Sequence, residues 1–198
     1  MEFIWIRHGM TKGNSERRYI GGRTDEGLCE AGRIELLAKK QADVYPMVDK
    51  VYVSPMKRCR ETAEILYPHV EQQIIEGFRE CDFGEFENRN AEELSDTIAY
   101  QRWIEANGDE GAAFPGGETP GEFSRRSVDA LLEILERETL PEKVAFVVHG
   151  GTIMAVFSAL AEEQKNFYDY HVDNGCGYRC VAELKNNRLR FTACKKIR

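Results

Sequence analysis

The stretch FIWIRHG, residues 3–9, joins a short apolar run to an arginine, a histidine and a glycine. Such an apolar run predicts a buried strand, and Gly9 allows the chain to turn tightly where the strand ends. A second stretch, VAFVVHGG at residues 144–151, repeats this pattern. Open α/β sheets place ligands at the carboxyl ends of their strands, so the two stretches predict a site with His8 and His149 side by side.

The composition bounds the class of protein. The chain has 198 residues, 42% of them hydrophobic and 31% charged, which is typical of a soluble globular protein. We expect a single domain over residues 1–198. The net charge of −7 argues against a nucleic-acid partner, and no segment has the length of a membrane span. The N-terminus lacks the basic start of a signal peptide, so we expect a cytoplasmic protein; the oligomeric state stays open.

The cysteines do not form a recognisable framework. A chain of this length without a secretory leader is expected to keep its thiols reduced and structural. No Cys-x-x-Cys pair or nearby histidine pair completes a zinc site. The six residues concerned are Cys29, Cys59, Cys81, Cys176, Cys180 and Cys194.

Strand and helix patterns alternate along the chain. Together they predict an α/β fold with a mostly parallel central sheet, helices on both faces and an antiparallel edge hairpin. The stretches 9–27, 76–90 and 107–119 read as loops. The predicted strands are 3–6, 48–53, 70–75 and 143–149, with a hairpin of 178–184 and 188–194 around residues 185–187. The predicted helices are 28–43, 91–105, 120–139 and 151–162, with one more that carries Arg58 and Thr62 on one face.

Three of these helices carry more specific expectations. Ser54 is placed to cap the helix of Arg58, with Pro55 at its first position. In the helix 28–43, the spacing of Ile34, Leu37 and Ala38 predicts one buried face. In the helix 120–139 the clearest apolar face consists of Val128, Leu131, Leu132 and Leu135.

The motifs Arg7-His8-Gly9, SPMKRCRETA at residues 54–63, Glu80 and His149-Gly150, together with Asn14, resemble the histidine phosphatase superfamily of phosphoglycerate-mutase-like proteins. The resemblance covers nearly the whole chain and keeps the family's motif order. It implies a phosphoglycerate-mutase-like fold and phosphoryl transfer through a phosphohistidine.

A phosphate dianion needs paired donors, and the planar fork of arginine matches two phosphate oxygens. Arg7 and Arg58 are the candidates, with Asn14 as a neutral donor. His149 adds a ring N–H, and a helix that starts at Gly150 turns backbone N–H groups toward the anion. Taken alone, Arg58 beside Lys57 and Arg60 also fits a solvated helix face, and Asn14 also fits a loop cap.

His8 is the candidate nucleophile, because a neutral imidazole attacks through one ring nitrogen while the other holds the proton. The resemblance implies that the carbonyl of Gly9 fixes that proton. Glu80 matches the family's general acid, and Asp82 either raises the pKa of Glu80 or competes for the role. His69 and His171 lack such a context and are expected to be structural or surface residues. We expect no metal and no cofactor, since arginines and histidines stabilise the charge.

The substrate is expected to be a small-molecule phosphomonoester, and the family contains both phosphatases and mutases. The resemblance implies that mutases of the family carry an insertion before the acid motif and a C-terminal tail over the site. Here only 17 residues separate Thr62 from Glu80, and the given sequence ends just after the hairpin. By comparison with these mutases, we expect a less covered site and hence a phosphatase. YIG at 19–21, FGEFE at 83–87, GGE at 116–118 and VDNGC at 172–176 resemble α-ribazole 5′-phosphate phosphatases of cobalamin assembly.

Two departures from the family pattern, Met10 and Gly13, reshape the mouth of the pocket. They leave other assignments open: a phosphoglycerate mutase, a broad-specificity sugar or nucleotide phosphatase, or, in another class, an inactive phosphate-binding regulatory protein.

Overall fold

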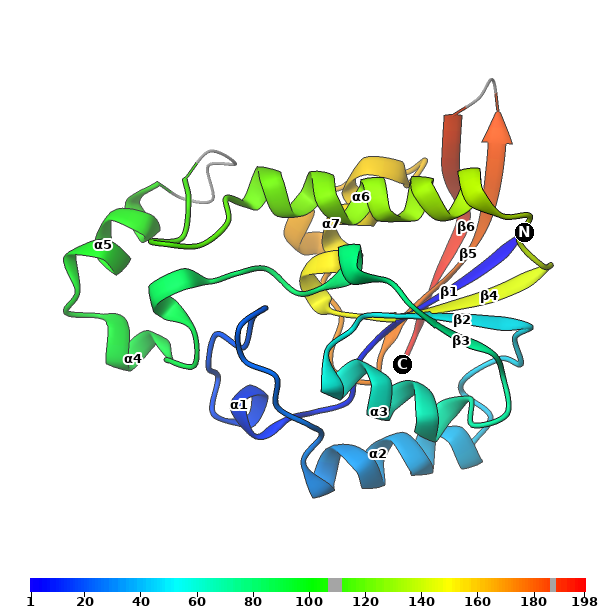
Figure 1. Cartoon of the computed structure of the whole chain (residues 1–198), viewed down its shortest axis with the longest axis horizontal. Coiled ribbons are helices and arrows are strands. Elements are labelled where there is room, and N and C mark those ends of the chain that lie inside the picture. The colour runs from blue at the N-terminus through cyan, green and yellow to red at the C-terminus, as the bar shows by residue number, and fades with distance from the viewer. Residues whose placement is uncertain (107–111, 186–187) are drawn as a thin grey trace.

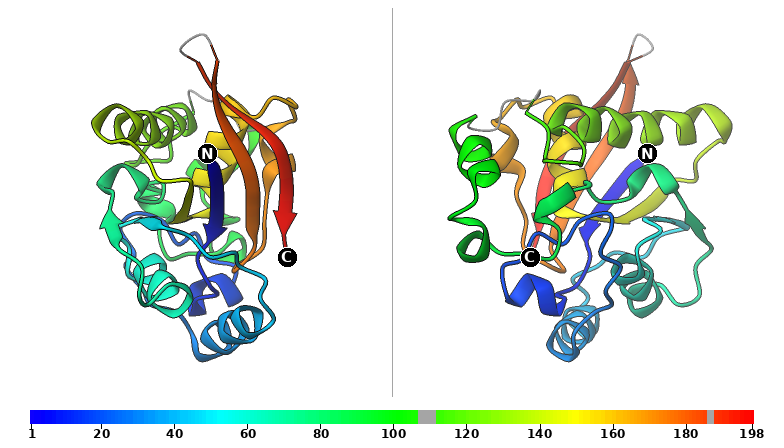
Figure 2. Two further views of the ribbon diagram at one scale, coloured as in Figure 1. Left: turned by 90° about the vertical axis from the view of Figure 1, so that its right-hand side faces the viewer. Right: turned by 60° about the vertical axis from the view of Figure 1, so that its left-hand side comes forward.

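The computed structural model describes residues 1–106, 112–185 and 188–198, and in them six strands form one mixed sheet (Figure 1). The strand order is β3-β2-β4-β1-β5-β6, with parallel pairing from β3 to β1. β5 and β6 form the predicted antiparallel hairpin at the edge, which rises beyond the rest of the sheet (Figure 2). The strands are β1 (Glu2–Arg7), β2 (Lys50–Val53), β3 (Gln72–Ile74), β4 (Lys143–Val148), β5 (Gly177–Lys185) and β6 (Arg188–Ile197). The predicted fold class is therefore confirmed.

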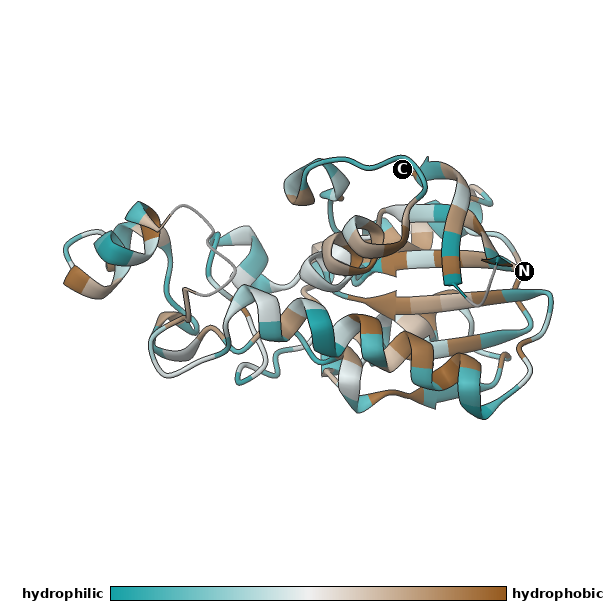
Figure 3. Cartoon of the chain, turned by 90° about the horizontal axis from the view of Figure 1, so that it is seen from above, coloured by the Kyte–Doolittle hydropathy of each residue, from teal (hydrophilic) through white to brown (hydrophobic). Residues whose placement is uncertain are grey.

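Helices cover both faces of the sheet because the central strands are apolar on both sides. In β1, Phe3 and Trp5 face the layer of α6 (Pro120–Arg137) and α7 (Gly150–Leu160). Ile4 and Ile6 face the opposite layer, formed by α2 (Glu30–Gln41) and α3 (Lys57–Leu66). Figure 3 shows the central strands as the most continuously apolar part of the chain. Among the described residues, no helix combines the length and the apolar composition that crossing a membrane requires.

Several short elements interrupt segments that were predicted to be uniform. The predicted helix 91–105 is two helices, since Thr97 accepts a hydrogen bond from the backbone N–H of Tyr100 and so starts a new helix. The two are α4 (Ala91–Leu94) and α5 (Ile98–Glu105). The predicted loops contain α1 (Lys12–Ser15) and two 3₁₀ turns, η1 (Glu76–Phe78) and η2 (Gly84–Phe86); a third turn is η3 (Phe167–Tyr170). Residues 107–111 of the predicted 107–119 loop, and residues 186–187 of the hairpin turn, lie outside the described residues.

The predicted apolar face of α2 is wrong. Ile34 and Leu37 are 60% and 46% exposed, and Ala38 is exposed as well. The buried side of α2 instead carries Gly32 and Leu36. A Cβ at position 32 would lie 2.2 Å from the carbonyl oxygen of Met10, so the helix packs on a backbone segment through its glycine rather than through its largest side chains.

The predicted apolar face of α6 is confirmed in part. Leu131 is fully buried, and Val128 and Leu135 are partly buried against the same core. Leu132 is 36% exposed at the rim of this face. The centre of the buried face lies instead over Phe123, Ser127, Ala130, Leu131 and Ile134.

Candidate active site

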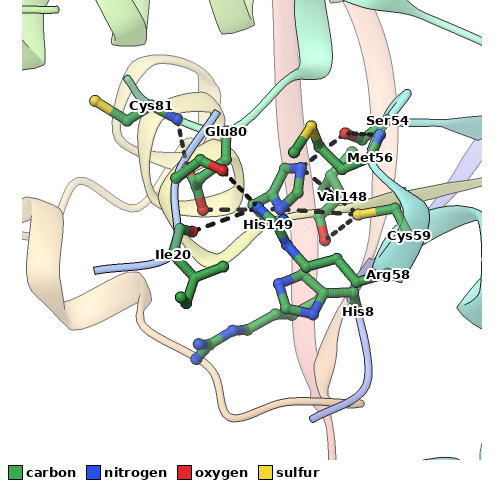
Figure 4. Close-up of polar contacts among 12 residues, drawn as sticks. His8, Ile20, Ser54, Met56, Arg58, Cys59, Glu80, Cys81, Val148 and His149 are labelled. Carbon is green, nitrogen blue, oxygen red and sulfur yellow. Dashed lines mark hydrogen bonds and ion pairs between the residues drawn. The ribbon is translucent and has the colours of Figure 1, made fainter. Parts of the chain in front are cut away.

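Three neighbouring strands of the sheet deliver polar side chains to one point. His8 follows β1, His149 follows β4 and Ser54 follows β2. Because Arg7 pairs with Val148 in parallel register, the two imidazoles lie side by side, with ring centroids 5.2 Å apart at 68° (Figure 4). The structure thus places His8 and His149 side by side, as the sequence predicted.

The ring of His8 is fixed through its Nδ1. That nitrogen lies 2.7 Å from the carbonyl oxygen of Gly9, so Nε2 is the nitrogen left for a ligand. The Gly9 peptide is held in turn, since its N–H donates to Thr62 Oγ1 at 3.0 Å, and the Thr62 hydroxyl donates to the carbonyl of Arg58. Burial, followed by the charges of Arg58 and Arg7, holds the pKa of His8 well below its usual value. The ring is therefore neutral and carries a free lone pair near neutral pH.

Arg58 is fully buried, so the alternative of a solvated helix face is wrong. Its neighbour Arg60 on α3 is the exposed one. Nη1 of Arg58 donates to the carbonyl of Thr24 at 2.9 Å, and Nη2 donates to the carbonyls of Ile20 and Gly21. Its Nε is buried and has no hydrogen-bond partner within the described ranges. A buried donor of a charged group left unpaired suits an anionic ligand.

Arg7 shows the same arrangement at the end of β1. Its Nη1 donates to the carbonyl of Val172 at 2.8 Å, while its buried Nε has no partner among the residues the structure describes. Gly150 permits this position, since a Cβ there would lie 3.3 Å from Arg7 Nε. His171, expected to be a structural or surface residue, is exposed and has its Nε2 3.4 Å from Arg7 Nη1. The first turn of α7, at Gly150, adds backbone N–H groups beside this guanidinium.

Glu80 lies in the irregular segment between η1 and η2, where it is buried next to His149. Its Oε2 is 3.8 Å from His149 Nδ1, and its Oε1 accepts the N–H of Cys81 at 3.0 Å. Burial raises the pKa of Glu80, which favours the protonated carboxyl that a proton donor needs.

Asp82, the competing carboxylate, pairs instead with Arg23 at 2.7 Å and accepts the N–H of Gly84. Asp82 is not among the causes that raise the pKa of Glu80, since the leading cause is burial. The geometry favours Glu80 over Asp82 for proton transfer beside His149.

Asn14 serves both of the roles considered for it. Its Oδ1 accepts from the backbone N–H of Thr11, which closes the capping box of α1, and also from Asn174 Nδ2 at 2.9 Å. With the oxygen engaged, the amide –NH₂ of Asn14 is the group left for a ligand. Asn174 also donates to the carbonyl of His8 at 3.1 Å, so it ties the 172–176 segment to the first motif.

The prediction that Ser54 caps a helix is wrong. α3 begins at Lys57 after an N-cap residue, Met56, that makes no side-chain cap. The hydroxyl of Ser54 lies 2.7 Å from His149 Nε2 instead. Figure 4 marks this contact with a dashed line. Burial, then the charges of Arg58, Arg7 and Arg126, holds the pKa of His149 well below its usual value, so this ring is neutral as well.

Three supporting residues were not identified as part of the site from the sequence. Thr62 shares a helix face with Arg58, which was a usable signal, and Asn174 stands in the VDNGC stretch. Ser54 gave no signal of its contact with His149, since the two are 95 residues apart. Within the ranges described, no group of three or more His, Cys, Asp or Glu side chains is placed to hold a metal ion.

Comparisons with known proteins agree with this geometry. The family model of the histidine phosphatase superfamily (branch 1) matches residues 3–195. The probable phosphoglycerate mutase GpmB of Yersinia pestis (strain Pestoides F) is 32% identical over 166 residues, 81% of this chain and 74% of that protein. Among solved structures, the α-ribazole phosphatase of Shigella flexneri is similar, with a TM-score of 0.80 at 23% identity over 97% of this chain and 95% of that one. A mycobacterial glucosyl-3-phosphoglycerate phosphatase gives a TM-score of 0.77 at 22% identity over 96% of both chains. At these identities the two structures show the shared fold.

Proposed function

This chain belongs to the histidine phosphatase superfamily, and from that premise we propose that it hydrolyses phosphomonoesters through a phosphohistidine at His8. The observation that carries the proposal is a pair of buried Nε atoms, those of Arg7 and Arg58, which have no partner among the described residues and lie around two neutral imidazoles. Such a cradle offers fixed positive charge to a dianion and leaves a nucleophilic lone pair beside it.

In the first step, His8 Nε2 attacks phosphorus and the bond from phosphorus to the ester oxygen breaks. The leaving alkoxide takes the proton of the Glu80 carboxyl, whose pKa is raised by burial. The guanidinium groups of Arg7 and Arg58 and the ring of His149 bind the equatorial oxygens, where charge accumulates. Asn14 and the N–H groups at Gly150 complete the phosphate site.

In the second step, water attacks the phosphohistidine and the N–P bond breaks. The Glu80 carboxylate takes a proton from that water, and the products are inorganic phosphate and free His8. Neither of these two steps uses a metal ion in our proposal, because the two arginines supply the positive charge that stabilises the phosphoryl group.

For the physiological substrate we propose α-ribazole 5′-phosphate. The stretches at 19–21, 83–87, 116–118 and 172–176 support it, as does the fold shared with the Shigella flexneri α-ribazole phosphatase. A phosphoglycerate mutase is the second candidate, because the relative in Yersinia pestis carries that name at 32% identity.

The proposal is tested by steady hydrolysis of p-nitrophenyl phosphate, first with the wild type and then with His8→Ala. Turnover that His8→Ala abolishes supports it; phosphate binding without turnover would favour a regulatory protein. The same enzyme is then given α-ribazole 5′-phosphate and 3-phosphoglycerate. Release of inorganic phosphate identifies a phosphatase, whereas conversion of 3-phosphoglycerate to its 2-isomer identifies a mutase.

A further inference from the structure

We propose that Ser54 is a positioning residue that holds His149 in the tautomer with its proton on Nδ1, so that this N–H is presented to the phosphoryl group. The catalytic role of this tautomer rests on the proposed function. The assignment of the tautomer itself rests only on the contacts of Ser54.

The contact joins two neighbouring strand ends in the interior of the protein. Ser54 follows β2 and His149 follows β4, and these strands pair in parallel. Both side chains are fully buried, and Ser54 Oγ lies 2.7 Å from His149 Nε2. This is the usual distance of a hydrogen bond from a hydroxyl, so one of the two atoms donates and the other accepts.

The remaining contacts of Ser54 decide which atom donates. The backbone N–H of Met56 donates to Ser54 Oγ at 3.4 Å, which uses the oxygen as an acceptor. In the part of the chain that the structure describes, the other side chain within reach of this hydroxyl is the Cys59 thiol, whose sulfur is a weak acceptor. If His149 Nε2 carried a proton, the buried O–H of Ser54 would keep only the weak thiol acceptor, which is unfavourable for a buried donor. Ser54 therefore donates to Nε2, and the neutral ring holds its proton on Nδ1.

A thiol touches the same ring but does not change this assignment. Cys59 Sγ lies 3.6 Å from Nε2 and 3.8 Å from Nδ1 of His149. Its own S–H has the carbonyl of Val148 as an acceptor at 3.5 Å. A thiol is a weak donor and a weak acceptor, so the shorter hydroxyl contact dominates.

The orientation of the His149 ring determines which of its nitrogens faces the site of phosphoryl transfer. His149 Nδ1 faces Glu80, whose Oε2 is 3.8 Å away, and so points to the side where the proton donor lies. A proton on Nδ1 donates to a phosphoryl oxygen, whereas the other tautomer would place a lone pair against that oxygen. A doubly protonated ring would carry N–H on both nitrogens and have no tautomers. The pKa of His149 lies well below its usual value, so the ring is singly protonated near neutral pH and the two tautomers differ.

The tautomer is measured directly on the unliganded protein labelled with ¹⁵N-histidine, by long-range ¹H–¹⁵N correlation at pH 7.5. The wild type is expected to show His149 with a protonated Nδ1 and an unprotonated Nε2. Ser54→Ala is expected to shift the ring toward the Nε2–H form, whereas Cys59→Ala keeps the Nδ1–H form. A wild-type His149 protonated on Nε2 overturns the proposal, and so does a Ser54→Ala spectrum with an unchanged tautomer.

Kinetics then connect the tautomer with turnover. Ser54→Ala is expected to lower kcat by about 10–100-fold with little change in KM, a loss of the size found when partners that orient metal-binding histidines are removed. Ser54→Thr keeps the hydroxyl and should restore the Nδ1–H signal and part of kcat. An unchanged kcat in Ser54→Ala rejects the positioning role. If the wild type hydrolyses no phosphomonoester, the proposed function fails, but the NMR result still decides the tautomer.

Discussion

Replacing Arg58 by alanine is expected to reduce kcat/KM for phosphomonoesters by about 10²–10⁴-fold. Arg58 donates to the carbonyls of Thr24, Ile20 and Gly21 through Nη1 and Nη2, while its Nε has no partner in the described part of the chain. We assign to the phosphate two charge-assisted hydrogen bonds, one from Nε and one from a further N–H. Each contributes about 1.5–3 kcal/mol, and about 1.4 kcal/mol corresponds to a factor of ten, which gives the range stated. Arg58→Lys should recover only part of this, since an ammonium lacks the planar fork.

The assay is kcat/KM for p-nitrophenyl phosphate together with the inhibition constant of inorganic phosphate. Arg60→Ala is the matched control, because Arg60 is an exposed arginine on the same helix. Circular dichroism and thermal unfolding separate a loss of fold from a loss of binding, since Arg58 also anchors the segment 20–24. If Arg58→Ala is as active as Arg60→Ala, the assignment of Arg58 to the phosphate is refuted.

Three further predictions concern the acid and the charge of the site. Glu80→Gln should impair alkyl phosphates far more than p-nitrophenyl phosphate, because an alkoxide needs a proton and a nitrophenolate does not; the reverse selectivity in Asp82→Asn would transfer the role to Asp82. Burial raises the pKa of Glu80, so kcat/KM for alkyl phosphates should fall as pH rises through that raised value, and a fall of equal size in Glu80→Gln would contradict the assignment. Activity should survive dialysis against EDTA; a loss that Mg²⁺ or Zn²⁺ restores would reveal a required metal.

The sequence predicted the parts of the site that stand at strand ends. His8 and His149 each follow an apolar run and precede a glycine, and the parallel pairing of β1 and β4 brings them together. Arg58 could be placed on a helix, but its burial depends on the segment 20–24 folding over it, which no local pattern shows. Glu80 lies in irregular chain, so only the family motif distinguished it from other acidic residues.

The errors have a common physical origin in contacts between distant segments. Ser54 has the composition of a helix cap, yet its hydroxyl binds His149, so α3 begins later. Ile34 and Leu37 have the spacing of a buried face, yet Gly32 packs against Met10 and turns both outward. Local propensity is a weak guide where such a contact determines the orientation of an element.

The central claim is that the phosphoryl group passes through His8, and rapid-quench trapping tests it most directly. Enzyme mixed with a ³²P-labelled monoester for milliseconds and quenched in alkali should carry label that is stable to base and released by acid, as expected for a phosphohistidine. Peptide mapping should place the label on His8, and His8→Ala should carry none. Turnover in the wild type without any labelled protein, or label that persists in His8→Ala, would contradict the mechanism.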